Sequence, residues 1–123
     1  MQNIGAVILA AGGSARFGRP KQLLKFGETT LVRRTVDLAR DAGCEPVIVV
    51  VGEQKNEIAE QVRGSCASVV ENENWCAGIG TSIRAGVEKL AAHANAAAVM
   101  LLVCDQPFVD ADLVREVIAL RRR

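Results

Sequence analysis

The sequence predicts an α/β fold in which a mostly parallel sheet is covered by helices on both faces. Short apolar runs of strand length alternate with segments of helical spacing along the 123 residues. Half of the residues are hydrophobic but only 3% are aromatic, which suits buried aliphatic strands and alanine-rich helices. This length is typical of one domain of about 100–200 residues. We therefore expect a single domain over residues 1–123.

The first predicted strand–helix unit opens with residues 4–10, an apolar run typical of a fully buried parallel strand. Residues 23–28 are short enough for a turn or a small hairpin. A helix then begins after an N-cap at Thr29 or Thr30 and ends at Gly43. The positions of this helix that follow helical spacing are Leu31, Val32, Thr35, Leu38, Ala39 and Ala42.

The same pattern recurs along the rest of the chain. Residues 46–51 and 67–70 are predicted strands on either side of a helix over residues 53–63, and residues 96–104 form the most hydrophobic strand. Two further helices are expected, one from Ser82 to about His93 and one that begins at Asp110 or Asp112. Their predicted inward residues are Ile83, Val87, Leu90 and Ala91 in the first, and Val114, Val117, Ile118 and Leu120 in the second.

Three unusual segments follow predicted strands: residues 11–21, 72–82 and 105–107. In an open parallel sheet, ligands bind outside the carboxyl ends of the strands. We therefore expect these three segments to form one site.

The segment from Leu9 to Lys21 has the composition of a phosphate cradle. Its glycines let backbone amides approach an anion, and Arg16 and Lys21 supply positive charge. Its spacing matches neither the Walker loop nor the dinucleotide fingerprint. The alternative is a flexible turn with solvated arginines.

Asp105 follows an apolar strand, where an ionised carboxylate is costly unless something compensates it. Mg²⁺ takes one or two carboxylates together with phosphate oxygens, so Asp105 is a candidate magnesium ligand opposite a triphosphate. The alternative is that Asp105 caps the turn before Pro107, and both roles can coexist.

The middle segment combines hydrogen-bonding side chains with glycines that would admit a flat ring. Asn74 and Trp75 precede Gly78 and Gly80, and Thr81 and Ser82 lead into a helix. This pattern fits the recognition of a nucleobase. An ordinary capped helix, with Trp75 closing the edge of the core, is the equal alternative.

Taken together, the three segments resemble the MobA-like nucleotidyltransferases, and within them most closely the molybdenum cofactor cytidylyltransferases. The resemblance covers nearly the whole chain, and the three motifs in this order are far more specific than the first alone. It implies a three-layer Rossmann-like, mostly parallel sheet of the nucleotide-diphospho-sugar transferase type. The matching residues are Leu9–Gly12, Ser14, Arg16, Gly18, Pro20–Leu24, Asn74, Trp75, Gly78, Gly80, Ser82, Gly86 and Cys104–Pro107.

The resemblance also implies the chemistry. A phosphate of molybdopterin would attack the α-phosphorus of CTP with Mg²⁺ bound, and pyrophosphate would leave. Arg16 and Lys21 would hold the triphosphate and Asp105 the metal, as the catalytic residues. The implied nucleotide-binding residues are Leu9, Ala10, Ala11, Gly12, Gly13, Ser14, Arg16, Lys21, Asn74, Gly78, Gly80, Thr81 and Ser82.

Pro20 before Lys21, and Asn74 before Trp75, differ from the usual guanylyltransferase pattern and favour CTP over GTP or another nucleoside triphosphate. Family members commonly extend well beyond 123 residues. The expectation is therefore that the chain holds the nucleotide-binding N-terminal part, while the C-terminal part, with a second acidic metal ligand and much of the acceptor pocket, is absent. Two alternatives remain: transfer to a sugar phosphate or other small acceptor, and nucleotide binding without catalysis.

Composition bounds the partners. A net charge of +1 offers no field that would hold nucleic acid or a membrane surface. The four cysteines show no C-x-x-C pair and are expected to be reduced thiols. Without a basic leader or a long apolar span the protein is expected in the cytoplasm, where a molybdoenzyme would receive the product.

Overall fold

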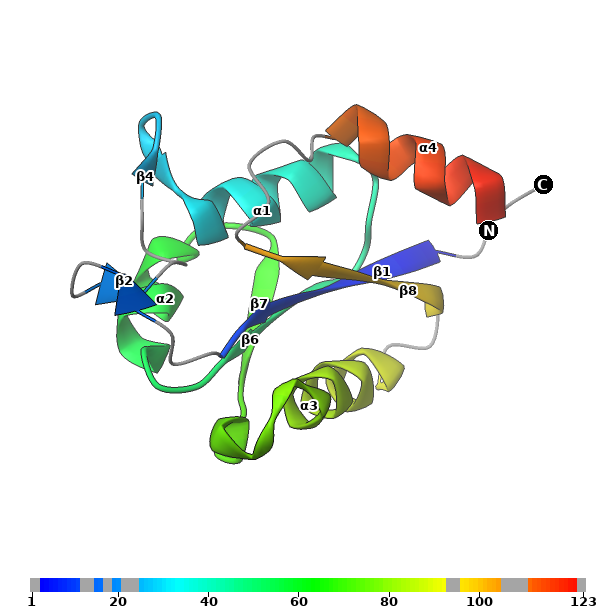
Figure 1. Cartoon of the computed structure of the whole chain (residues 1–123). Helices are drawn as coiled ribbons and strands as arrows, with labels where there is room; N and C mark the ends of the chain where they lie inside the picture. The colour runs from blue at the N-terminus through cyan, green and yellow to red at the C-terminus, as the bar shows by residue number, and fades with distance from the viewer. Residues whose placement is uncertain are drawn as a thin grey trace.

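The computed structural model describes residues 3–11, 15–16, 19–20, 25–92, 96–104 and 111–121. In this part of the chain four strands form one sheet in the order β7-β6-β1-β8 (Figure 1). The central strands are β1 (Asn3–Ala10) and β6 (Val47–Val51), and the outer strands are β7 (Ala67–Glu71) and β8 (Ala96–Val103). Each neighbouring pair is parallel, which confirms the predicted sheet.

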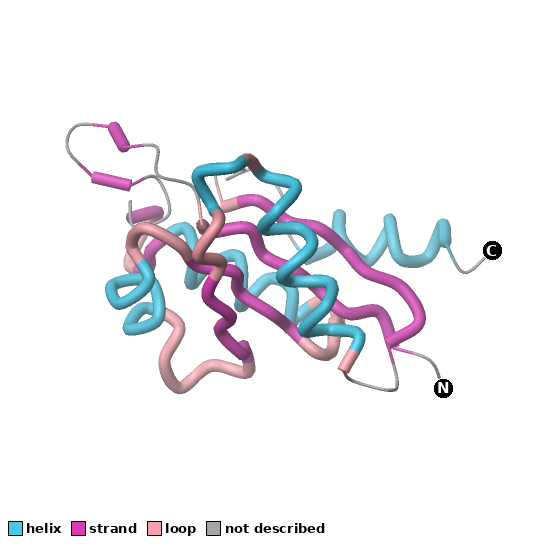
Figure 2. The backbone as a smooth tube through the Cα atoms, turned by 90° about the horizontal axis from the view of Figure 1, so that it is seen from below, coloured by secondary structure: helices cyan, strands magenta, loops and turns pink. Residues whose placement is uncertain are grey.

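Helices cover both faces of this sheet (Figure 1). On one face lie α1 (Leu31–Asp41), α2 (Lys55–Gln61) and α4 (Ala111–Arg121). Their buried residues form one core with every second residue of β1 and β6. On the other face α3 (Ile79–Ala91) packs on Val7, Ile48 and Val50. Seen from below, α3 lies along the strands (Figure 2). Because successive strand side chains point to opposite faces, both layers bury every second residue.

The predicted N-cap of α1 and the glycine predicted to end it are confirmed. Thr30 is its N-cap and accepts a hydrogen bond from the Arg33 backbone N–H to its Oγ1 at 3.3 Å. Gly43, with a φ of +88°, follows the helix in the left-handed conformation that favours glycine. The buried residues include Val32, Thr35, Val36, Leu38 and Ala39, so the predicted face is largely correct.

The predicted beginning and inward face of α3 are corrected by the structure. The helix begins at Ile79 after Gly78, whose φ of +121° is accessible to glycine, so residues 79–82 form its first turn rather than a loop. Its buried residues are Ser82, Gly86 and Leu90, whereas Val87 is 37% exposed. A Cβ at Gly86 would overlap the side chains of Val7 and Val50. Close approach to the sheet therefore selects small residues that hydrophobic spacing does not indicate.

In α4 the predicted inward face is half right. Val114 and Ile118 are buried, but Val117 is 45% exposed. Leu120 has a side chain outside the described part. Val114 and Ile118 are one helical turn apart, so α4 contacts the core along a single narrow line of side chains.

Several short elements complete the architecture. The predicted hairpin near residues 23–28 exists as β4 (Lys25–Phe26) and β5 (Thr29–Thr30). Two further strands, β2 (Ala15–Arg16) and β3 (Arg19–Pro20), pair antiparallel after β1, and the single turn η2 (Trp75–Ala77) precedes α3. Across the described residues, none of the helices has both the length and the apolar character that crossing a membrane requires.

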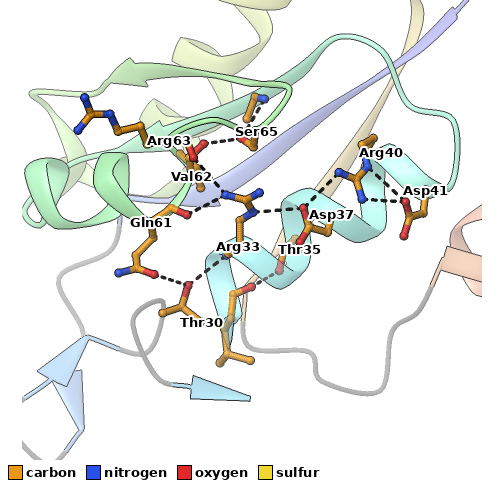
Figure 3. A network of polar contacts seen from close by, with 12 residues as sticks. Thr30, Arg33, Thr35, Asp37, Arg40, Asp41, Gln61, Val62, Arg63 and Ser65 are labelled. Carbon is orange, nitrogen blue, oxygen red and sulfur yellow. Dashed lines mark hydrogen bonds and ion pairs between the residues drawn. The ribbon is translucent and has the colours of Figure 1, made fainter. Parts of the chain in front are cut away.

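Figure 3 shows how α1 is joined to the end of α2. The Arg33 guanidinium donates from Nη1 to the carbonyls of Gln61 and Arg63, at 3.4 and 3.2 Å, and pairs through Nε with Asp37 Oδ1 at 3.3 Å. Thr30 Oγ1 also lies 3.3 Å from Gln61 Oε1. These contacts satisfy carbonyls that the short α2 leaves without helical partners.

Candidate nucleotide site

The end of β1 lies between the ends of two neighbouring strands. The strand register pairs Ala10 with Val51 of β6, and Leu9 with Val103 of β8. The thiol of Cys104 lies 3.9 Å from the Leu9 carbonyl oxygen. The start of the first segment and the residue before Asp105 are therefore neighbours, as the parallel sheet predicts.

The described start of the first segment offers backbone rather than side chains. Ala10 and Ala11 are 1% and 2% exposed, so their methyl groups belong to the core. The backbone of Arg16 pairs with that of Arg19 in β2–β3, and Figure 1 shows this arm at the carboxyl end of the sheet. Gly12, Gly13, Ser14, Lys21 and Asp105 lie outside the described residues, as does the side chain of Arg16.

Gly52 joins the first and middle segments. A Cβ built on it would lie 2.6 Å from the Ala11 carbonyl oxygen and 2.8 Å from Cγ and Cδ1 of Trp75. Real Cβ atoms do not approach other atoms so closely, so a larger residue would displace one of the two segments. Trp75 thus packs at the edge of the core, as one of the two predicted alternatives held, and it does so against the strand end beside Ala11.

Asn72 organises the middle segment. Its side chain is 5% exposed, and its Nδ2 donates to Thr81 Oγ1 and Ser82 Oγ, each at 2.9 Å. Its Oδ1 accepts from the backbone N–H of Asn74 at 3.0 Å. The backbone N–H of Asn72 donates to the Val51 carbonyl at 2.8 Å. The buried carboxamide therefore ties the start of α3 to the end of β6.

The predicted residues of the middle segment divide into exposed and internal groups. Asn74, Gly78 and Gly80 are exposed, and a Cβ at Gly80 would meet nothing within 4 Å. Ser82 is 4% exposed and its hydroxyl accepts from Asn72. Thr81 is intermediate in exposure, and its single hydroxyl proton lies within donating distance of the carbonyls of Asn74 and Gly78, at 2.9 and 2.8 Å. The open backbone around Gly80 is the part that a flat ring can approach.

Resolved pKa shifts lie away from this end of the sheet. Burial raises the pKa of the Cys44 thiol, which precedes β6, and a hydrogen bond from Arg40 to Asp41 raises the pKa of that guanidinium. The described residues contain no group of three or more histidine, cysteine, aspartate or glutamate side chains that would hold a metal. A metal site from the described residues alone is therefore not indicated.

Sequence reasoning missed Asn72 and Gly52 as site-forming residues. Both follow directly on strand ends, where a glycine or a short polar residue marks a close approach or a turn. That position was the available signal. The partners of Asn72 lie nine and ten residues ahead, and no sequence period connects them.

The family model described as the MobA-like NTP transferase domain matches residues 6–123. The chain is 40% identical over 95 residues to the bifunctional IPC transferase and DIPP synthase of Rubrobacter xylanophilus, covering 72% of this chain and 22% of that protein. It is 32% identical over 111 residues to the probable molybdenum cofactor guanylyltransferase of Opitutus terrae, covering 88% and 50%. It is 28% identical over 122 residues to the molybdenum cofactor cytidylyltransferase of Escherichia coli K12, covering 98% and 61%.

Solved structures agree with this family match. The crystal structure of Rv0371c from Mycobacterium tuberculosis H37Rv superposes with a TM-score of 0.82 at 33% identity, covering 98% of this chain and 60% of that one. The same protein in complex with manganese gives 0.75 at 32% identity, with the same two coverages. The nucleotide-diphospho-sugar transferase fold is thereby confirmed. The chain spans between about a fifth and three fifths of the length of the curated relatives named above.

Proposed function

Because this chain belongs to the MobA-like NTP transferase family, we propose that it binds a nucleoside triphosphate at the carboxyl ends of β1, β6, β7 and β8 and transfers its nucleotidyl group. One observation carries this proposal. Three parallel strands, β1, β7 and β8, end at the same edge of the sheet. They are followed by Ala11, by residues 72–82 and by Cys104. A triphosphate, its base and a metal would need groups from all three segments.

The proposed donor is CTP. Pro20 before Lys21 and Asn74 before Trp75 support it, because the guanylyltransferase pattern usually differs at both places. The relatives do not decide between bases, since one is named a guanylyltransferase and another a cytidylyltransferase. The exposed backbone at Gly78 and Gly80 is where this choice would be made.

In the proposed mechanism, a phosphate of a molybdopterin-type acceptor attacks the α-phosphorus of CTP in line, and pyrophosphate leaves. Arg16 and Lys21 would hold the triphosphate and neutralise charge that builds up on its oxygens. The backbone of residues 10–13 and the Gly78–Ser82 region would contact the cytosine and the ribose. This chemistry needs positioning and charge rather than a covalent nucleophile.

Magnesium is the proposed metal at this edge. Mg²⁺ prefers oxygen ligands, and Asp105 directly follows Cys104, whose thiol lies beside Leu9. The Mycobacterium tuberculosis relative solved with manganese supports a divalent metal in this family. When bound, Mg²⁺ would polarise the phosphates and stabilise the departing pyrophosphate.

The test is pyrophosphate release by the purified chain with Mg²⁺ and CTP, GTP or UTP, each with molybdopterin and with a sugar phosphate. We expect the highest turnover with CTP and molybdopterin. Asp105→Asn should abolish metal-dependent turnover, while Asp41→Asn, at the last residue of α1, should leave it unchanged. A clear preference for GTP or UTP would refute the cytidylyl assignment.

The second candidate is a nucleotide-binding part without turnover of its own. It is the alternative to transfer that the sequence leaves open. This candidate predicts that CTP binds but that no pyrophosphate appears with any acceptor. Turnover by the chain would exclude it.

A further inference from the structure

We infer that Asn72 is a positioning residue of the proposed nucleotide site, which sets the Gly78–Ser82 turn in its binding shape before a nucleotide arrives. This inference rests on the proposed function and goes beyond it. Asn72 does not face a ligand, since its side chain is 5% exposed. It acts through Thr81 and Ser82 in the first turn of α3.

Both donors of the Asn72 carboxamide are used, and its oxygen is an acceptor. Both N–H groups of Nδ2 are donated, one to Thr81 and one to Ser82, and Oδ1 accepts from the Asn74 backbone. A primary amide has two donors and one carbonyl oxygen, so an apolar residue of the same shape would replace none of these bonds. Buried polar groups left without partners destabilise the arrangement that buries them.

Thr81 connects the Asn72 carboxamide to the exposed backbone between Asn74 and Gly78. Its hydroxyl accepts from Asn72 and lies within donating distance of the carbonyls of Asn74 and Gly78. Those two carbonyls flank η2, whose last residue leads to the +121° φ of Gly78. Asn72 is therefore linked through one hydroxyl to both ends of the turn before α3.

At its own position Asn72 is attached to the sheet. Its backbone N–H donates a hydrogen bond to the carbonyl of Val51 at the end of β6, and Gly52, which follows Val51, is enclosed by Ala11 and Trp75. The turn that Asn72 holds is consequently fixed relative to the first residues after β1. A base on the Gly78–Gly80 backbone and phosphates on the first segment would need this fixed separation.

Trp75 gives a direct readout. It is the chain's single tryptophan, the chain has no tyrosine, and the half-buried indole of this middle-segment residue packs against Gly52. Its fluorescence, excited at long wavelength, is measured while CTP, GTP or UTP is added with Mg²⁺. The same samples are unfolded in urea to measure stability separately.

Three variants test the inference. Asn72→Leu keeps the branched shape and the number of heavy atoms but loses all three side-chain hydrogen bonds, so we expect the dissociation constant of the preferred nucleotide to rise by about tenfold or more. Asn72→Asp keeps the acceptor for the Asn74 backbone N–H and lets the Ser82 hydroxyl donate to it, but it draws the single Thr81 hydroxyl proton away from the Asn74 and Gly78 carbonyls, so we expect a smaller rise in the dissociation constant than for Asn72→Leu. Thr35→Val is the matched control, because it removes another buried hydroxyl bond, to Leu31 at 2.7 Å, on the opposite face.

Thr35→Val should lower stability and keep the affinity within about twofold, since the two sites share no partner. Asn72→Leu with unchanged affinity would overturn the inference while leaving nucleotide binding intact. Loss of affinity in Asn72→Asp as large as in Asn72→Leu would contradict it as well. Wild-type protein that binds none of the three nucleotides would overturn both the inference and the proposed function. If Asn72→Leu does not fold, Ser82→Ala replaces it, because it removes one of the hydrogen bonds of Asn72. A rise in its dissociation constant supports the inference, and an unchanged affinity overturns it.

Discussion

Two glycines at the carboxyl end of the sheet have opposite surroundings. Gly52 is buried, and a Cβ there would lie 2.6 Å from the Ala11 carbonyl oxygen. Gly80 is exposed in the first turn of α3, and a Cβ there would enter open space. The lack of a side chain at Gly52 lets Ala11 and Trp75 pack closely, whereas at Gly80 it leaves open space beside the backbone of α3.

This contrast predicts opposite effects of the same substitution. Gly52→Ala should lower the free energy of unfolding by about 1–3 kcal/mol, because Ala11 or Trp75 must move. Gly80→Ala should change it by less than about 1 kcal/mol, or raise it, because alanine is favoured in a helix. Urea titration measures both, and calorimetric titration with CTP should then show weaker binding to Gly80→Ala. Equal loss of stability in both variants would contradict the assigned surroundings.

A second residue-scale prediction concerns Cys44. Burial raises the pKa of its thiol, so the folded state favours the neutral form over the thiolate. This contribution is complete below the ordinary thiol pKa of about 8.5 and is lost as the pH rises through the higher folded value. Urea unfolding from pH 7.5 to 10 should therefore show stability falling with pH. The fall should be smaller in Cys44→Ala, and equal slopes would refute the prediction.

At the scale of elements, α1 and α2 are joined by one guanidinium. Arg33 and Arg84 each form an i,i+4 ion pair, with Asp37 and Glu88, through Nε at 3.3 and 3.1 Å. Arg33 alone of these two also donates to carbonyls at the end of α2, and its side chain is 29% exposed against 81% for Arg84. The two arginines therefore form a matched pair that differs in the contact between helices, and Figure 3 shows that contact for Arg33.

We expect Arg33→Ala to cost about 1–2 kcal/mol of stability, because the α2 carbonyls lose a charged donor. Arg84→Ala should cost less than about 0.5 kcal/mol, since exposed ion pairs contribute little. Thermal or urea unfolding of both variants measures the difference. Similar losses would show that the carbonyl contacts add nothing to the ion pair.

The order and type of the main elements could be predicted because each depends on neighbouring residues. Residues 47–51 are a β-branched run between Pro46 and Gly52, and Thr30 and Gly43 enclose α1. The beginning of α3 could not be predicted from Gly78 and Gly80, because glycines usually weaken a helix. Tertiary contacts from Asn72 to Thr81 and Ser82 override that preference.

At the scale of the whole molecule, the parallel sheet determines what meets at the candidate site. Strands far apart in sequence end at one edge, so Leu9 and Cys104 become neighbours although 95 positions separate them. The position of this edge could be predicted from the alternation of strands and helices, because it specifies a parallel sheet whose carboxyl ends lie together. The roles of Gly52 and Asn72 could not, because packing distances and hydrogen bonds between segments decide them. Arg16, Lys21 and Asp105 keep their roles as predictions.

The central claim is that a nucleoside triphosphate binds at this edge through the segment from Leu9 to Lys21. Isothermal titration calorimetry of CTP with Mg²⁺ into the wild-type chain and Lys21→Ala tests it most directly. We predict saturable binding of one CTP to the wild type and a dissociation constant at least about tenfold higher for Lys21→Ala, because a charged contact to phosphate is lost. Equal affinities, or no heat of binding to the wild-type chain, would contradict the claim.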